Sequence, residues 1–467
     1  MNIASTIKAV LPPAFRPVLA RIEASPLAYR LARGAFWSLS GALIARGLGL
    51  LASVLVARVL GKEGYGELGI VQSTLGMFGT LAGFGLGMTA TKFIAQYRTT
   101  DPARAGRIRA LSSAFAWVSS SATAAVLFVL APWLADRTLA APQLTGLLQA
   151  GSLFLLLTAV NGAQMGALSG FESFKMVAKI SLLSGLANFP LMVGGVYLAG
   201  LQGAVWGMVA AAAINWLLNH IAIRRECSAA GVPYTYTGCW TEQAVLWQFS
   251  LPALISGMLF SPTEWVLNTM LVNQPGGYGQ MGVFSAAKQW HVLILYLPNV
   301  LSATTLPVLS NLLGENKRKQ YMQMLVLNSL LLTGVAAAAA LPVCLLSRTI
   351  MGMYGKDFAG AWQVLVYVAV YSVLWASNIV VGQAMWSTGA SKEAMLFAGL
   401  RSVILLASGA LLVRYGASGL ALAMLVTYVI QTIYLIPYVK YKSARYFAGA
   451  DAPGLGEAKP LFAGARK

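Results

Sequence analysis

The hydropathy pattern along the chain consists of long apolar runs separated by short polar segments. A helix needs about 20 apolar residues to cross roughly 30 Å of hydrocarbon, and runs of that length recur along nearly the whole chain. No stretch is left over for a soluble domain. The pattern therefore predicts twelve transmembrane helices, at residues 35–57, 68–88, 110–133, 147–168, 180–199, 203–222, 250–273, 282–305, 322–347, 361–386, 394–413 and 417–438.

The longest polar interruption, RRECSAAGVPYTYTGCWTEQ, separates six of these helices from the other six. Together with the twelve apolar runs, this interruption predicts an all-α integral membrane protein with two six-helix lobes around a central cavity. The expected divisions are a basic amphipathic cytoplasmic N-terminal arm (1–34), an N-lobe (35–223), a cytoplasmic inter-lobe linker (224–249), a C-lobe (250–440) and a cytoplasmic tail (441–467).

The two halves share short sequence marks at matching places. SLSGAL (38–43) corresponds to LISGML (254–259), and GYGELG (64–69) corresponds to GYGQMG (277–282). Because each lobe has six helices, the second lobe begins in the same orientation as the first. This indicates a parallel repeat about an axis along the membrane normal, with the substrate site between the lobes.

Basic residues gather on one side of the predicted membrane. Of 33 Lys and Arg residues, 24 lie in the termini and even-numbered loops, 6 lie in the opposite loops and 3 lie inside helices. By the positive-inside rule both termini are cytoplasmic. The net charge of +19 is thus expected from orientation and from attraction to anionic headgroups, and nucleic-acid binding is not predicted.

The inventory of reactive residues argues against catalysis. Hydrophobic residues make up 58% of the chain, mean hydropathy is +0.69, and there are only two histidines. No carboxylates are paired within a predicted helix, no phosphate-binding loop or metal signature occurs, and the predicted external loops are short. We therefore expect a transport protein without a cofactor, and no disulfide among Cys227, Cys239 and Cys344.

Arg46 is the first candidate site residue, since it lies about 16 Å into the first helix. A guanidinium at that depth normally faces water or a protein partner. Ser53 and Gly49 lie on the same face, which suits a cavity or a close helix. Two interpretations remain: a structural arginine, or a group that attracts an anion into a central cavity.

The seventh and eighth helices carry polar faces as well. Glu264 lies with Asn268 on one helix, and Lys288 lies with His291 on the next. Glu264 and Lys288 can form either a static buried bridge or a bridge that opens when a substrate phosphate arrives. His291 is either a packed polar residue or a titrating group, whereas Arg401 is expected to be structural.

The segment WSLSGALIARGLGLLASVLVARVLGKEGYGELGIVQS (37–73) resembles the polysaccharide-exporting branch of the multidrug, oligosaccharidyl-lipid and polysaccharide exporter superfamily. Its pattern A-R-x-L-G-x-x-x-Y-G is carried here by Ala57, Arg58, Leu60, Gly61, Tyr65 and Gly66. Further similar segments are GALSGFESFK (166–175), FSAAKQ (284–289), LPVLSNL (306–312) and MYGKDFAGA (353–361).

The resemblance implies a flippase of the bacterial inner membrane, with both termini cytoplasmic. Its substrate would be an undecaprenyl-pyrophosphate-linked oligosaccharide for O-antigen or exopolysaccharide assembly, and its partners would be membrane lipids, a glycan polymerase and chain-length proteins. In such proteins helices 1, 2, 7 and 8 line a central cleft. The predicted substrate-binding residues are Arg46, Ser53, Glu264, Asn268, Lys288 and His291.

Two other functions fit parts of the pattern: a cation-coupled multidrug exporter of the same superfamily, and a membrane enzyme of glycan assembly. Charge in the cavity distinguishes them, because a cationic lining favours an anionic lipid-linked substrate and an acidic lining favours drugs. In the superfamily that this chain resembles, the drug exporters usually rely on an acidic residue in the first lobe. No predicted helix of that lobe contains one here.

Overall fold

The computed structural model describes residues 26–250, 254, 259–303 and 305–450. The described residues are predominantly helical and include no strand. The N-terminal half contains α3 (Pro26–Gly83), α4 (Leu86–Tyr97), α5 (Pro102–Trp133), α6 (Thr145–Gly170) and α7 (Phe174–Ala229). The C-terminal half contains α9 (Ser261–Val272), α10 (Gly277–Ile294), α11 (Tyr296–Ser302), α12 (Thr305–Gly314), α13 (Arg318–Leu345), α14 (Ser347–Tyr354), α15 (Lys356–Ala359), α16 (Trp362–Ser387), α17 (Ser391–Leu412) and α18 (Gly416–Ala450).

Glycines break the longest helical segments. Eight segments of the described chain are long and apolar enough to cross a membrane, and three of them run for 51 to 56 residues. Each of these three contains a glycine with positive φ: Gly61 (φ 71°), Gly200 (φ 56°) and Gly416 (φ 66°). Only glycine adopts this conformation without strain, so the chain reverses there and each long segment crosses twice.

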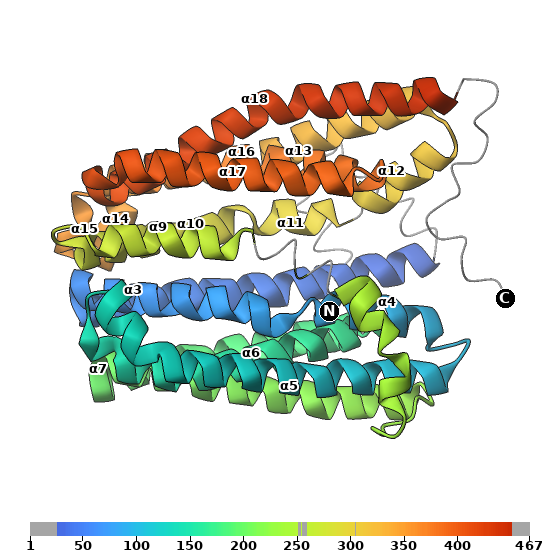
Figure 1. Ribbon diagram of the computed structural model, residues 1–467, viewed down its shortest axis with the longest axis horizontal. Coiled ribbons are helices and arrows are strands. Elements are labelled where there is room, and N and C mark those ends of the chain that lie inside the picture. The colour runs from blue at the N-terminus through green and yellow to red at the C-terminus, as the bar shows by residue number, and fades with distance from the viewer. Residues whose placement is uncertain (1–25, 251–253, 255–258, 304, 451–467) are drawn as a thin grey trace.

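With these breaks, the eight segments supply eleven of the twelve predicted crossings. The remaining predicted helix, 250–273, ends in α9, and its first half includes residues outside the described part of the chain. Helices α3 to α7 form one bundle and α9 to α18 form a second, with their long axes side by side (Figure 1). The all-α, two-lobe membrane architecture predicted from the sequence is confirmed.

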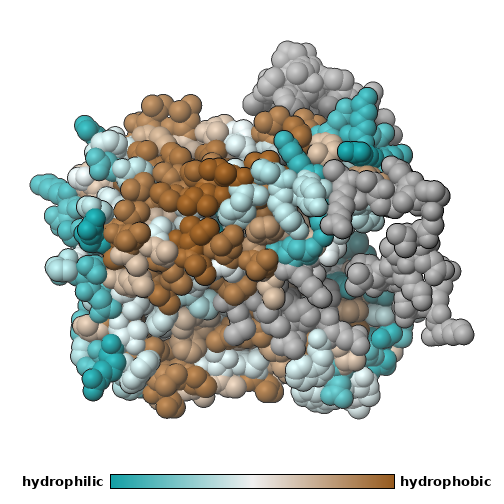
Figure 2. All heavy atoms as spheres, turned by 45° about the horizontal axis from the view of Figure 1, so that its top comes forward, coloured by the Kyte–Doolittle hydropathy of each residue, from teal (hydrophilic) through white to brown (hydrophobic). Residues whose placement is uncertain are grey.

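The surface matches a position within a membrane. Figure 2 shows a broad hydrophobic region across the middle of the molecule, with hydrophilic residues at its left and right ends. Exposed Leu, Val and Phe side chains are numerous on the described residues, for example Phe128, Val129, Leu198 and Leu345. Apolar side chains that would be costly to expose to water are therefore placed against lipid.

The predicted linker is held firmly by the N-lobe. Helix α7 continues to Ala229, and the segment after it packs on α5. Glu242 pairs with Arg104 and Arg107 at 3.1 and 3.0 Å. The buried Arg109 guanidinium lies 4.0 Å from the ring centroid of Tyr234, and burial raises the pKa of this phenol, an effect that Arg109 partly offsets. The linker thus packs on the N-lobe up to about residue 250.

The predicted arm and tail are described only in part. Residues 1–25 of the arm and 451–467 of the tail lie outside the described residues. The rest of the arm begins α3, and residues 441–450 end α18.

Candidate functional site

The two copies of the repeated G-Y-G segment contact each other across the lobes. A Cβ atom built on Gly66 would overlap the carbonyl oxygen of Tyr278, and one built on Gly282 would overlap the carbonyl oxygen of Lys62. Only glycine permits backbones to approach this closely. We call this contact, of residues 62–66 with residues 278–282, the glycine clasp.

Side chains around the glycine clasp join the same two lobes. Arg58 Nε donates to the Met353 carbonyl oxygen at 2.6 Å. The buried Tyr65 ring lies 6.4 Å from Tyr354 and 6.3 Å from Phe358 between centroids. The motif residues Arg58, Tyr65 and Gly66 thus meet the C-lobe at one end of the bundle, which the charge distribution predicts to be external.

Below the clasp, a cavity lies between the lobes. It consists of two adjoining pockets of about 310 Å³ and about 260 Å³, which share Gln72, Gln289 and Val292 on their walls. The first is lined mainly by Ala45, Arg46, Gly49, Ser53, Tyr65, Leu68, Asn188, Met192 and Leu293. The second is lined mainly by Gly69, Ser73, Gly76, Ser261, Glu264, Asn268, Met281, Ser285 and Lys288. We call the two pockets together the central cavity.

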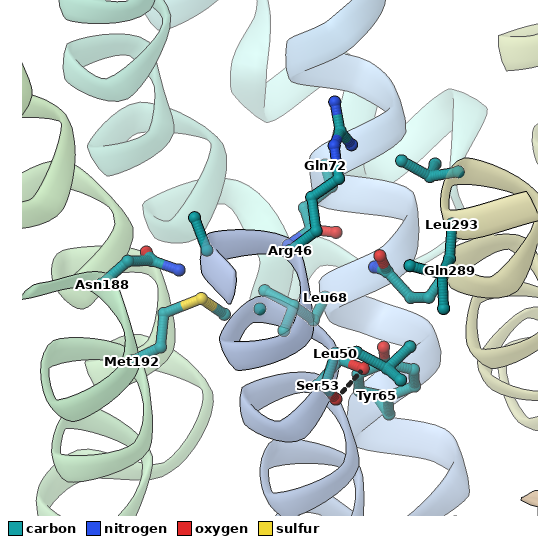
Figure 3. A pocket seen from close by; sticks show the side chains of 13 residues that line it. Arg46, Leu50, Ser53, Tyr65, Leu68, Gln72, Asn188, Met192, Gln289 and Leu293 are labelled. Carbon is teal, nitrogen blue, oxygen red and sulfur yellow. Dashed lines mark hydrogen bonds between the residues drawn. The ribbon is translucent and has the colours of Figure 1, made fainter. Parts of the chain in front are cut away.

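Arg46 is the cation of the first pocket. Figure 3 shows its side chain between Asn188 and Met192 of α7 on one side and Gln289 and Leu293 of α10 on the other. Its guanidinium carbon lies 5.0 Å from the ring centroid of Tyr296. Arg46 is exposed, and no carboxylate of the described residues is within ion-pair distance of it. An arginine without a carboxylate in a cavity between lobes retains its capacity to bind an anion.

Glu264 and Lys288 meet in the second pocket. Lys288 Nζ lies 2.6 Å from Glu264 Oε2, and their side chains are 34% and 18% exposed. Both belong to the C-lobe, so the pair does not itself join the lobes. Asn268, beside them, donates to Ser73 Oγ of the N-lobe at 2.8 Å.

Ser53 and His291 occupy different surroundings. Ser53 lines the first pocket, where its Oγ lies 3.4 Å from the hydroxyl of Tyr354. His291 is not among the residues that line the central cavity. Its Nδ1 is 2.8 Å from Ser372 Oγ, and its ring packs on Tyr371. Because residues three apart on a helix differ in direction by about 60°, Lys288 faces the cavity while His291 faces α16.

Sequence reasoning missed the amides of the central cavity. Gln72, Asn188 and Gln289 line it although none was predicted as a site residue. Neutral amides in apolar helices have no spacing rule, but Gln289 does end the family-like segment FSAAKQ. Among the described residues, no group of three or more His, Cys, Asp or Glu side chains is placed to hold a metal ion.

Comparison with known proteins identifies the family. The profile of the polysaccharide biosynthesis protein family matches residues 31–313. The chain belongs to this family. Among curated relatives, it is 22% identical over 399 residues to the EPS I polysaccharide export inner membrane protein EpsE of Ralstonia solanacearum, covering 84% of this chain and 89% of the relative. It is 23% identical over 406 residues to the lipid III flippase of Escherichia coli strain K12, covering 86% and 96%.

A solved structure supports the fold of this family member. The inward-facing conformation of a multidrug resistance MATE transporter of the MOP superfamily superimposes with a TM-score of 0.74, at 15% identity, over 90% of this chain and all of the other. This polysaccharide biosynthesis protein is therefore a multi-pass transmembrane protein with the two-lobe fold of those transporters.

Proposed function

We propose that the protein is a flippase for undecaprenyl-pyrophosphate-linked oligosaccharides in the bacterial inner membrane. It would carry repeat units from the inner to the outer leaflet for O-antigen or exopolysaccharide assembly, with both termini in the cytoplasm. Support comes from the family, and from relatives named for polysaccharide export and lipid III flipping. The observation that carries the proposal is Arg46, a cation that has no carboxylate partner among the described residues and lies in a cavity between the lobes.

Charge in the central cavity suits a diphosphate. A diphosphate carries about two negative charges, and each pairing with a cation at 4 Å is worth roughly 4 kcal/mol at an effective dielectric constant near 20. Arg46 can donate two parallel hydrogen bonds to phosphate oxygens. Lys288 is already engaged by Glu264, so Arg46 is the principal anion-binding group and Lys288 becomes available only if that pair rearranges.

The remaining parts of the substrate have suitable surroundings. Amides and hydroxyls of the central cavity can bind glycan hydroxyl groups, and the prenyl chain can stay in lipid beside the helices. The glycine clasp closes the cavity toward the predicted external side, so delivery requires the clasp to open while the opposite end closes. Hydrogen bonds from α9 to α3, such as Trp265 Nε1 to Thr74 Oγ1 at 3.0 Å, must rearrange in that motion.

Other functions fit the lining less well. The fold would also suit a cation-coupled drug exporter, but Arg46 is the one charged residue that lines the first pocket. An enzyme of glycan assembly would need free acid and base groups, whereas the one carboxylate on the described wall of the central cavity is bonded to Lys288. We therefore propose a transporter without catalytic activity, whose partners are lipids, a glycan polymerase and chain-length proteins.

Substitution of Arg46 tests the proposal. In purified protein, Arg46→Ala is expected to weaken binding of undecaprenyl pyrophosphate roughly 10- to 150-fold, since hydrogen bonds to charged groups contribute about 1.5–3 kcal/mol. Arg46→Lys should restore part of it, because a point charge attracts phosphate but lacks the planar fork. In cells, surface glycan export should fall more in Arg46→Ala than in Arg46→Lys.

Arg414→Ala is the matched control, because Arg414 contacts Tyr415 at the far end of α17 and lines neither pocket. Folded protein at wild-type levels is required of every variant. Wild-type diphosphate binding and glycan export in folded Arg46→Ala protein would refute the assignment.

A further inference from the structure

A second cavity opens from Arg46 into the interior of the N-lobe. It is a partly open pocket with a volume of about 370 Å³, within the range of small-ligand sites, and it is lined by the first half of α3, by α6 and by both halves of α7. Ala45, Arg46 and Asn188 line both this cavity and the central cavity. Arg46 therefore stands at the junction between the two. We call this space the N-lobe pocket.

The polar lining of the N-lobe pocket is neutral apart from Arg46. Its hydrogen-bonding side chains are hydroxyls and carboxamides, namely Thr158, Asn161, Ser181, Ser184, Asn188 and Asn215. Phe154 adds an aromatic ring, and no carboxylate or lysine is among the lining residues. Hydroxyls and amides both donate and accept hydrogen bonds, as sugar hydroxyls do. A cationic drug would require an acidic group, and a lipid chain would require an apolar wall.

Two lining residues have unused hydrogen-bonding capacity. Asn161 is 7% exposed, and its Nδ2 donates to the Ala212 carbonyl oxygen at 3.1 Å. Its Oδ1 and the Oγ of Ser184 are buried without a hydrogen-bond partner among the described residues. Buried polar atoms normally have a hydrogen-bond partner, because a buried donor or acceptor without one costs free energy. Both atoms have almost no accessible surface, so a polar occupant reaches them only when these side chains turn toward the pocket that their residues line.

The position of Arg46 connects this pocket to the proposed substrate. In a polyprenyl-diphosphate-linked glycan the first sugar is bonded directly to the diphosphate, so a site next to the diphosphate receives that sugar. We propose that the N-lobe pocket binds the first sugar of the lipid-linked glycan while Arg46 holds the diphosphate. This inference rests on the proposed function and extends it, because it assigns sugar recognition to α6 and α7.

The test compares diphosphate lipids with and without a sugar. Full-length protein in lipid nanodiscs is titrated with farnesyl diphosphate alone and with farnesyl diphosphates that carry one neutral hexose or one N-acetylhexosamine. At least one sugar-bearing probe should bind more tightly than the sugar-free probe. Asn161→Leu and Ser184→Ala should each weaken binding of that sugar-bearing probe about 2- to 10-fold. Neither should change the affinity for the sugar-free probe.

Asn378→Leu is the matched control. The Oδ1 of Asn378 is also buried without a hydrogen-bond partner in the described part of the chain, but Asn378 belongs to α16 of the C-lobe and does not line the N-lobe pocket. It should leave the affinity of all probes unaltered. Ser184→Ala removes a single oxygen, so it tests the pocket even where Asn161→Leu lowers the yield of folded protein.

The results separate this inference from the proposed function. Absence of diphosphate binding, or binding that ignores Arg46→Ala, would overturn the proposed function. Arg46-dependent binding in which neither sugar improves affinity would overturn the N-lobe pocket alone. So would an equal loss for sugar-bearing and sugar-free probes in Asn161→Leu and Ser184→Ala.

Discussion

Gly66→Ala should destabilise the contact between the lobes without touching the central cavity. Gly66 lies on the second half of α3, where the opposing α10 backbone leaves no room for a Cβ atom. Alanine suits the helix itself, because its intrinsic helix propensity is higher than that of glycine. The perturbation therefore acts on the glycine clasp, while the conformation of α3 is unchanged.

The size of the effect follows from the clasp geometry. The added Cβ would lie 2.8 Å from the Tyr278 carbonyl carbon and 2.9 Å from the Gly282 nitrogen, and it would overlap the Tyr278 oxygen. These are backbone atoms, so the two helices must separate by about 1 Å. Overpacking of this kind costs about 1–3 kcal/mol. Because the cost falls only on the clasped state, the equilibrium should shift roughly 5- to 150-fold toward the state that is open at this end.

A cysteine behind the clasp reports this shift. Gln72→Cys places a thiol in the central cavity, in a chain from which Cys227, Cys239 and Cys344 have been removed. A membrane-impermeant maleimide is added to intact cells, and the initial labelling rate is measured. We expect faster labelling with Gly66→Ala. Gly79→Ala is the matched control, because Gly79 lies on the same helix, lines neither pocket of the central cavity and has nothing within 4 Å of an added Cβ.

An unchanged rate in a folded Gly66→Ala protein would show that the glycine clasp does not control access. An equal rise in Gly79→Ala would show that alanine acts through α3 itself. Gly282→Ala provides a second variant from the other lobe, and it should behave as Gly66→Ala does, because its Cβ would overlap the Lys62 carbonyl oxygen.

Two further predictions concern the ion pair and the orientation. Lys288→Met should lower the free energy of unfolding by about 1–3 kcal/mol, which is less than for a fully buried pair because Lys288 is a third exposed. Adding Glu264→Gln should recover part of this loss in thermal melts. Single and double variants of equal stability would show that the pair contributes little. Cysteines introduced at Thr145 and Gly276 should react with an impermeant thiol reagent from outside the cell, and one at Asn316 should not; the opposite pattern would reverse the orientation.

Much of the fold could be predicted from the sequence because crossing a membrane depends on local hydropathy. A helix in lipid satisfies its own backbone hydrogen bonds, so each apolar run specifies a crossing without reference to the others. The glycine at 61 marks a chain reversal for a similarly local reason, because its φ of 71° with ψ of −178° lies in a region that essentially only glycine adopts. The position of Arg46 deep within the first predicted helix also identified it as a candidate site residue.

What surrounds each side chain was decided by tertiary structure. The repeat in G-Y-G was visible in the sequence, but that the two copies pack on each other across the lobes depends on how the lobes dock. Lys288 and His291 are one turn apart, yet one reaches Glu264 and the other packs on Tyr371. The N-lobe pocket assembles Asn161 with side chains of two other helices, and no spacing rule connects residues that meet only when helices pack. Hydropathy specifies where the chain crosses, whereas packing specifies which faces meet and what they can bind.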